Sequence, residues 1–174
     1  MIIKIKIKLL NKMVSIVNGN ILDYTEDNKN VFICHQTNCV TKTSAGLAKS
    51  IFDKYPESNI YKNNNILRTP GVYIETKTND GKTIIHLNAQ NTPGKVSDKE
   101  TSYQRLEWFQ SCLALLSHDI NNNNFINNTP EIILFPYGIG CGLAGGNWDD
   151  YLKSIGIFNQ TLPKHITLKI ILLP

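Results

Sequence analysis

Short strand-like runs alternate with amphipathic helical stretches along this chain, and no other sequence feature constrains the fold as strongly. Six runs are rich in β-branched residues and bounded by turn residues; they are Val14–Val17, Val31–Cys34, Val72–Thr76, Thr83–Leu87, Ile132–Phe135 and Ile166–Leu173. Three helical stretches fit between these runs. Strands that alternate with helices form a sheet covered on both faces, so the pattern predicts an α/β fold, a three-layer α/β/α sandwich with about six strands.

Apolar residues recur at helical spacing in each of the three helical stretches. The stripes are Ala48, Ile51, Phe52 and Tyr55 in the first, Leu106, Phe109, Leu113 and Leu116 in the second, and Trp148, Tyr151, Leu152 and Ile155 in the third. We expect Ser44 to cap the first helix and Pro56 to end it, since a serine side chain satisfies free amides and proline cannot continue a helix. Asn147 is the predicted cap of the third helix, and the asparagine run 121–124 is predicted to end the second.

The length of 174 residues fits one domain, and 41% hydrophobic residues are enough to form a core. No apolar run reaches the roughly 18 residues that a transmembrane helix needs. Residues 1–12 alternate isoleucine with lysine, so we expect an N-terminal extension or an extra edge strand there, and a single domain over 13–174. These features predict a monomer without membrane contacts, located in the cytoplasm or nucleus.

The net charge of +4 mildly favours anionic ligands, but it is not the clustered basic surface of a nucleic-acid binder. The cysteines contain no CxxC pair, which indicates reduced thiols rather than a disulfide scaffold; they are Cys34, Cys39, Cys112 and Cys141. Three histidines have no carboxylate or thiol at metal-ligand spacing; they are His86, His118 and His165. We therefore expect neither a metal nor a cofactor.

The segment 135–148, FPYGIGCGLAGGNW, lies between a predicted buried strand and a predicted helix and contains five glycines in nine residues. Glycines let the backbone approach a ligand and turn successive amides toward it, an arrangement that suits a phosphate or diphosphate, with the helix N-terminus beyond adding to the attraction. The segment fits equally well a turn that needs glycine only for tight packing and binds no ligand. The segment matches neither GxGxxG nor the P-loop motif.

The segment 34–48, CHQTNCVTKTSAGLA, also joins a predicted strand to a helix. Its polar side chains gather at the end of a strand, which is where open α/β sheets bind ligands. The alternative is a hydrogen-bonded loop in which His35 and Asn38 only satisfy backbone groups. Cys39 and Cys141 are expected to be inert thiols, because the spacing of Cys39 from His35 does not create an activated nucleophile.

Together and in this order, three segments resemble the macrodomain family of ADP-ribose-binding modules. They are VNGNIL at 17–22, HQTNCVTKTSAGLAKSIFDKYP at 35–56, and FPYGIGCGLAGGNW at 135–148. The likeness covers nearly everything outside the N-terminal extension and implies a mixed central sheet. Within the family, the chain looks most similar to ADP-ribose-1''-phosphate phosphatases and to the terminal ADP-ribose glycohydrolase type.

The resemblance implies a role for each matching residue. Asn20 and the amide of Ile21 would lie beside the adenine, and Asn38 would hold the distal ribose hydroxyls. The residues implied near the terminal ribose are Ser44, Gly46 and Leu47. Those implied to wrap the phosphates with backbone amides are Gly138, Ile139, Gly140, Cys141, Gly142 and Leu143.

The resemblance also sets expectations for chemistry. The lysine and aspartate of the glycohydrolase type correspond here to Gln90 and Ala144, so that lysine mechanism is not expected. The predicted catalytic residues are His35 as general acid or base, Asn38, and Lys42 as the cation that neutralises a phosphate, with Asp149 as a fallback base. The predicted function is binding of ADP-ribose and hydrolysis of ADP-ribose 1''-phosphate. Removal of ADP-ribose from modified macromolecules and a non-catalytic reader of ADP-ribose are the alternatives.

Overall fold

A computed structural model describes residues 14–27, 29–125 and 128–174, so the expectation for residues 1–12 lies outside the described residues. Six strands form one sheet in the order β1-β6-β5-β2-β4-β3. Their bounds are β1 Ser15–Asn18, β2 Val31–Asn38, β3 Tyr73–Lys77, β4 Thr83–Gln90, β5 Ile132–Pro136 and β6 Thr167–Leu172. All neighbouring strands are parallel except β3, which pairs antiparallel with β4. The predicted mixed sheet of about six strands is confirmed.

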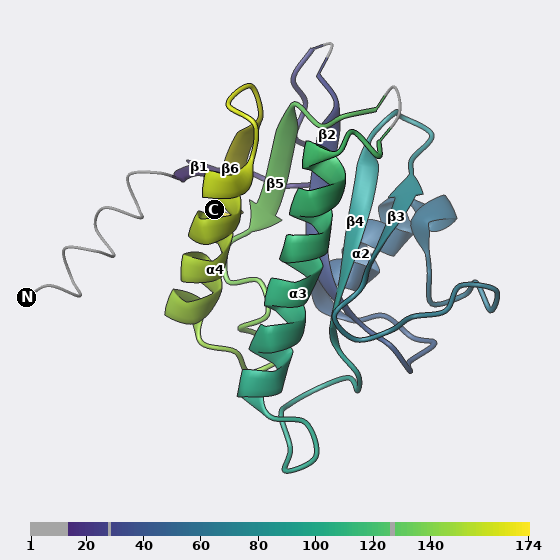
Figure 1. Ribbon diagram of the computed structural model, residues 1–174. Coiled ribbons are helices and arrows are strands. Elements are labelled where there is room, and N and C mark those ends of the chain that lie inside the picture. The colour runs from purple at the N-terminus through teal and green to yellow at the C-terminus, as the bar shows by residue number, and fades with distance from the viewer. Residues whose placement is uncertain (1–13, 28, 126–127) are drawn as a thin grey trace, which may run out of the picture.

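Helices cover both faces of the sheet, as predicted. The helices α3 (Ser102–Asn121) and α4 (Trp148–Thr161) pack on one face, and α2 (Gly46–Lys54) with the 3-10 turn η1 (Pro56–Ser58) packs on the other (Figure 1). Successive strand side chains point to opposite faces, so Phe32 joins the core under α3 and α4 while Ile33 joins the core under α2. The two apolar cores make the three-layer sandwich.

The helix ends confirm two sequence predictions and correct a third. Asn147 caps α4 by accepting from the amides of Asp149 and Asp150, and α3 ends at Asn121 within the asparagine run. Ser44 does not cap α2, because the N-cap is Ala45 and no side chain accepts its free amides. Ser44 therefore lies one residue before the N-cap position, and the helix begins at Gly46 with a φ of +54°.

The loops that follow β2 and β5 begin at the same edge of the sheet, at the carboxyl ends of these strands. These strands are parallel neighbours in the sheet, but β2 leads to α2 on one face and β5 leads to α4 on the other. Loops that diverge to opposite faces at the carboxyl ends of adjacent parallel strands leave a crevice between them. The fold therefore predicts a ligand site between the loop 39–45, here called loop one, and the loop 137–147, here called loop two.

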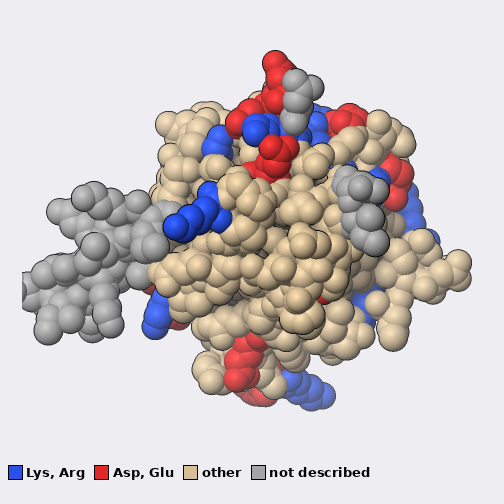
Figure 2. All heavy atoms as spheres, turned by 45° about the horizontal axis from the view of Figure 1, so that its top comes forward, with Lys and Arg blue, Asp and Glu red and all other residues tan. Residues whose placement is uncertain are grey.

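The opposite end of the sheet has a different character. Figure 2 looks obliquely onto the end where the parallel strands begin, and positive and negative side chains are interspersed there. Lys29 pairs with Glu131 at 2.7 Å and Lys169 with Glu26 at 3.1 Å. Charges of mixed sign do not form the single-sign surface that nucleic acids need. Over the residues described, no helix is long and apolar enough to cross a membrane.

Candidate functional site

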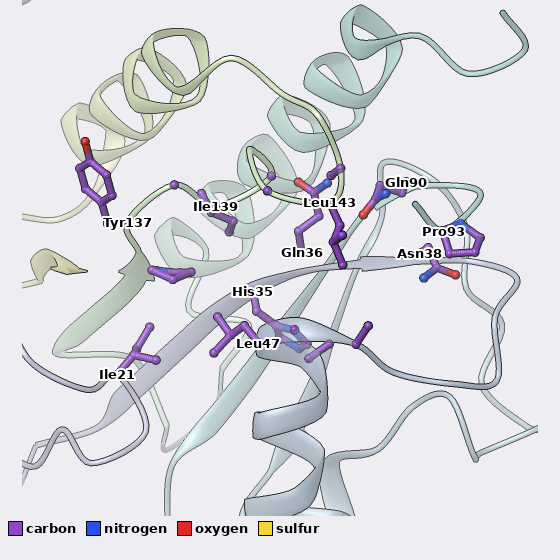
Figure 3. Close-up of a pocket in the computed structure, with 18 of the residues that line it drawn as sticks. Ile21, His35, Gln36, Asn38, Leu47, Gln90, Pro93, Tyr137, Ile139 and Leu143 are labelled. Carbon is purple, nitrogen blue, oxygen red and sulfur yellow. The ribbon is translucent and has the colours of Figure 1, made fainter. Parts of the chain in front are cut away.

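A cavity of about 510 Å³ lies at the carboxyl ends of the strands, between loop one and loop two (Figure 3). Its volume is in the range of small-molecule sites. The walls include ten of the residues predicted from sequence: Ile21, His35, Asn38, Gly46, Leu47, Gly138, Ile139, Gly140, Gly142 and Leu143. None of the described lining residues is an Asp, Glu, Lys or Arg, so the walls carry no formal charge.

Two predicted contact residues, Asn20 and Cys141, use their side chains within their own turns and lie outside the cavity walls. The Oδ1 of Asn20 accepts from the amide of Leu22 at 3.0 Å, which fixes this side chain beside its own backbone. The Sγ of Cys141 lies 3.2 Å from the carbonyl oxygen of Ile139. Burial raises the pKa of the Cys39 and Cys141 thiols to about 11, so neither is a thiolate at neutral pH.

Three further candidates also lie outside the walls. Lys42 is exposed, Ser44 is half-buried, and neither lines the cavity. Asp149 is exposed in the first turn of α4. A cation or a base for chemistry in the cavity must therefore come from another residue or from a movement of these loops.

Loop two is shaped by its glycines and by backbone hydrogen bonds. Gly138 and Gly140 have φ values of +71° and +73°, which favour glycine. A Cβ atom on Gly140 would lie 2.6 Å from the Cζ of Tyr151 and 2.7 Å from the Oε1 of Gln36. Both the backbone conformation and the space beneath it exclude a side chain at this position.

Several amides of loop two remain available to a ligand. The amides of Ile139, Cys141, Gly145 and Gly146 donate to carbonyls within the loop or at its start. Six others find no acceptor within the described part of the chain: Gly138, Gly140, Gly142, Leu143, Ala144 and Asn147. Successive free amides in a glycine-rich turn form a concave site for an anion.

A buried arginine anchors loop two. Arg105, on α3, is 1% exposed and donates to the carbonyl oxygens of Ala144 at 2.9 Å and Gly94 at 2.6 Å. Its Nε donates to Glu100 at 2.8 Å. Burial raises the pKa of Glu100, but hydrogen bonds from Thr92 and the pairing with Arg105 outweigh burial, so the net pKa is lowered. Arg105 thus ties loop two to the segment that follows β4.

Loop one is held by side chains rather than by its own backbone. The Oδ1 of Asn38 accepts from the amides of Val40 at 3.3 Å and Thr41 at 2.9 Å. Arg68 donates to the carbonyl oxygens of Asn38 at 3.2 Å and Thr41 at 2.8 Å, and its guanidinium lies over the Tyr61 ring. Of the two residues considered from sequence as partners of backbone groups, Asn38 has this role and also lines the cavity, whereas His35 bonds the side chain of His86.

The N-termini of α2 and α4 at this edge differ in their free amides and in their charge. The first turn of α2 contains no acidic residue, its amides have no side-chain cap, and Gly46, Leu47 and Ala48 line the cavity. The first turn of α4 is capped by Asn147 and holds two aspartates. The helix that favours an anion is therefore α2, and not the helix after loop two as expected from the sequence.

His35 lies on the α2 side of β2, facing away from Gln36 (Figure 3). Its Nε2 is 2.7 Å from the Nδ1 of His86, and the Nε2 of His86 is 2.8 Å from the Thr76 hydroxyl. The Nδ1 of His35 is buried and has no partner among the described residues. Burial lowers the pKa of His35 to about 3, so the imidazole is neutral at pH 7.

Sequence reasoning missed several wall residues, notably Tyr61, Pro93 and Tyr137, and gave no contact role to Gln36 and Gln90. The predicted strand ended at Cys34, whereas β2 continues to Asn38, and its alternation places Gln36 on the face opposite His35. Asn38 and Gln90 are partners in the β2–β4 register, a contact that needs the strand order. Nothing in the described residues groups three or more His, Cys, Asp or Glu side chains for a metal.

The arrangement defines an α/β/α sandwich with an uncharged cavity at a sheet switch point, closed by a glycine-rich loop. A scan against family models and a comparison with curated proteins found no match. Among solved structures, the macrodomain of Mycobacterium tuberculosis DarG is similar over 91% of this chain and 96% of its own, with a TM-score of 0.66 and 19% identity. A mutant of the Oceanobacillus iheyensis macrodomain is similar over 91% and 83%, with a TM-score of 0.63 and 21% identity. The chain has the macrodomain fold.

A protein of unknown function from Bacteroides thetaiotaomicron has the same architecture. It is similar over 91% of this chain and 97% of its own, with a TM-score of 0.70 and 18% identity. These identities are low, so the likeness concerns the fold, and the ligand must be argued from the cavity itself.

Proposed function

We propose that residues 13–174 of this chain form a domain that binds ADP-ribose in the cavity between loop one and loop two. The free amides of loop two carry this proposal, since six of them have no acceptor in the described chain and Gly140 leaves no room for a side chain. Oxygens of a diphosphate accept hydrogen bonds from such amides. The uncapped first turn of α2 favours the same charge from the other side of the cavity.

In the proposed orientation, the diphosphate lies against Gly138 to Leu143. The adenine extends toward Ile21 and Asn20, and the distal ribose extends toward Asn38. The apolar side chains of Ile21, Ile139 and Leu143 and the ring of Tyr137 suit a purine and the carbon faces of the riboses.

Calorimetric titration with ADP-ribose tests this proposal. Gly142 is the position to vary, because a Cβ there meets nothing within 4 Å and its backbone does not require glycine. Gly142→Glu places a carboxylate beside the free amides and should abolish binding, whereas the neutral Gly142→Gln should weaken it far less. Equal affinity of Gly142→Glu and the wild type would remove loop two from the site.

We propose hydrolysis of ADP-ribose 1''-phosphate as a second function, favoured by His35, which lines the cavity and whose buried Nδ1 has no partner among the described residues. In this reaction water attacks the phosphorus and the bond between phosphorus and the ribose oxygen breaks. The ribose oxygen leaves and takes up a proton lost by the water, which gives ADP-ribose and inorganic phosphate. With a pKa of about 3, His35 is neutral at pH 7. It is therefore a weak base toward the water, and the general-acid role expected from the sequence is not available at that pH.

Phosphorus NMR of the protein with ADP-ribose 1''-phosphate separates the two proposed functions. Release of inorganic phosphate by the wild type, lost in His35→Gln with ADP-ribose affinity retained, supports the hydrolase. Binding without release leaves an ADP-ribose reader, or an enzyme that removes ADP-ribose from macromolecules. An ADP-ribosylated protein incubated with the same sample distinguishes those two.

A further inference from the structure

The hydrogen bonds of loop one fix which end of the Asn38 amide is the oxygen. Two backbone amides, those of Val40 at 3.3 Å and Thr41 at 2.9 Å, point at one atom of this side chain. A backbone N–H only donates, so that atom is the carbonyl oxygen. The other atom, Nδ2, lies 3.2 Å from the Tyr61 phenol oxygen and must donate to it.

The Tyr61 phenol oxygen therefore accepts two hydrogen bonds from the same residue. The backbone amide of Asn38 donates to it at 3.1 Å, and the Nδ2 of Asn38 donates at 3.2 Å. Neither group accepts, so the phenol hydrogen must point in a third direction. The structure shows no acceptor for this hydrogen in the residues it describes. Tyr61 is 4% exposed, and both it and Asn38 line the cavity.

The surroundings of this pair favour an anionic oxygen. The guanidinium of Arg68 lies 4.8 Å from the centroid of the Tyr61 ring and adds positive charge behind it. No carboxylate lines the described cavity walls to repel an anion. Burial raises the pKa of Tyr61, which outweighs the Asn38 and Arg68 contacts that lower it, so the phenol keeps its hydrogen at neutral pH.

We infer that the Tyr61 hydroxyl and the second hydrogen of the Asn38 amide form a paired donor for an oxygen of a phosphate monoester on the distal ribose. This inference rests on the proposed binding of ADP-ribose. It adds that Tyr61 and Asn38 favour a ligand with a phosphate on the distal ribose. Hydrogen bonds to an ionised acceptor are about twice as strong as neutral ones. A ligand with a distal phosphate therefore gains more from this pair than a free sugar hydroxyl does.

Affinities of three ligands test the inference: ADP, ADP-ribose, and the 1''-phosphonate analogue of ADP-ribose 1''-phosphate, which cannot be hydrolysed. Tyr61→Phe keeps the ring packing and removes only the hydroxyl. We expect it to weaken the phosphonate by about tenfold or more, to weaken ADP-ribose less, and to leave ADP within about twofold, since ADP lacks the distal ribose.

Tyr55→Phe is the matched control. Tyr55 is also 4% exposed, its hydroxyl bonds Leu22 and Asp80 outside the cavity, and it does not line the walls. This variant should leave all three affinities unchanged, which separates loss of a buried hydroxyl from loss of the paired donor.

Each of three outcomes would overturn the inference. If Tyr61→Phe weakens the phosphonate and ADP-ribose by the same factor, the hydroxyl only positions loop one, and the inference is overturned while the proposed function stands. An unchanged phosphonate affinity overturns it as well. If the wild type binds none of the three ligands, the proposed function fails, and the inference fails with it.

Discussion

Loop one and loop two close the same cavity but are built in opposite ways. In loop one, side chains take up the backbone amides, because Asn38 accepts from Val40 and Thr41, and the Thr41 hydroxyl accepts from Thr43. In loop two, the backbone turns on glycines and leaves six amides without an acceptor in the described chain. Loop one thus meets a ligand with side chains, and loop two meets it with main-chain donors.

The two loops therefore depend on different residues for their shape. The shape of loop one depends on a few anchors that lie elsewhere in the sequence, such as Tyr61 and Arg68. The shape of loop two depends on the absence of a side chain at Gly140 and on one distant anchor, Arg105. Substitutions should therefore affect the two loops by different mechanisms and by different amounts.

Removing the anchor of loop two should have the largest effect. Arg105→Met leaves the buried Glu100 carboxylate without its charged partner, which we expect to cost about 3–5 kcal/mol in the free energy of unfolding. Chemical denaturation measures this loss, and ADP-ribose affinity should fall because Ala144 loses its tether. Adding Glu100→Gln to the same chain should recover part of the stability. A loss below about 1 kcal/mol would contradict the anchoring role.

Three alanine substitutions in loop two should separate crowding from backbone conformation. Gly140→Ala suffers both the collision with Tyr151 and a left-handed φ, for about 3 kcal/mol. Gly138→Ala has the same kind of φ but open space, for about 1 kcal/mol. Gly142→Ala has neither and should stay within about 0.5 kcal/mol. Thermal or denaturant unfolding gives the ranking, and any other order would contradict this view of loop two.

Lowering the pH should reduce the free energy of unfolding through β2, which precedes loop one, but not through β5, which precedes loop two. β2 buries His35 in its neutral form with a pKa of about 3, whereas β5 contains no titratable residue. The unfolded chain binds this proton near pH 6.5, so the stabilisation is complete above that pH and is lost as the pH falls toward 3. We expect His35 to contribute a loss of about 2 kcal/mol between pH 7 and pH 5.

Denaturation at the two pH values measures this effect. His35→Gln should reduce the slope of the profile, because the glutamine side chain does not titrate. His86 contacts His35 and has a pKa that burial also lowers, so this variant should retain a smaller slope. A wild-type stability that does not change between pH 7 and pH 5 would show that His35 is not buried in neutral form.

Two cations of the loop-one region should give the smallest effects and differ from each other. Arg68→Met removes hydrogen bonds to Asn38 and Thr41 and should cost about 1–2 kcal/mol. Lys42→Met alters an exposed side chain and should stay within about 0.5 kcal/mol. ADP-ribose affinity should follow the same order. Strong loss of affinity in Lys42→Met alone would restore the cation role expected from the sequence.

The layers, the six strands and the place of the glycine-rich loop were predictable from the sequence. Each depends on a local rule: alternation of strand and helix, apolar spacing, or a backbone that only glycine adopts. The cap at Asn147 followed the same logic and is confirmed, whereas the cap expected at Ser44 failed because α2 begins at Gly46, one residue later than a cap at Ser44 requires.

The sequence by itself determined the architecture and the two loops that close the cavity, because periodicity and glycine placement act over a few residues. Only the tertiary structure decided which side chains serve those loops. Tyr61 lies 23 residues from Asn38, and Arg105 lies 39 residues from Ala144. His86 meets His35 only because β4 pairs with β2. A hydrogen-bond partner or a shifted pKa depends on neighbours that the fold brings together, and no local pattern encodes them.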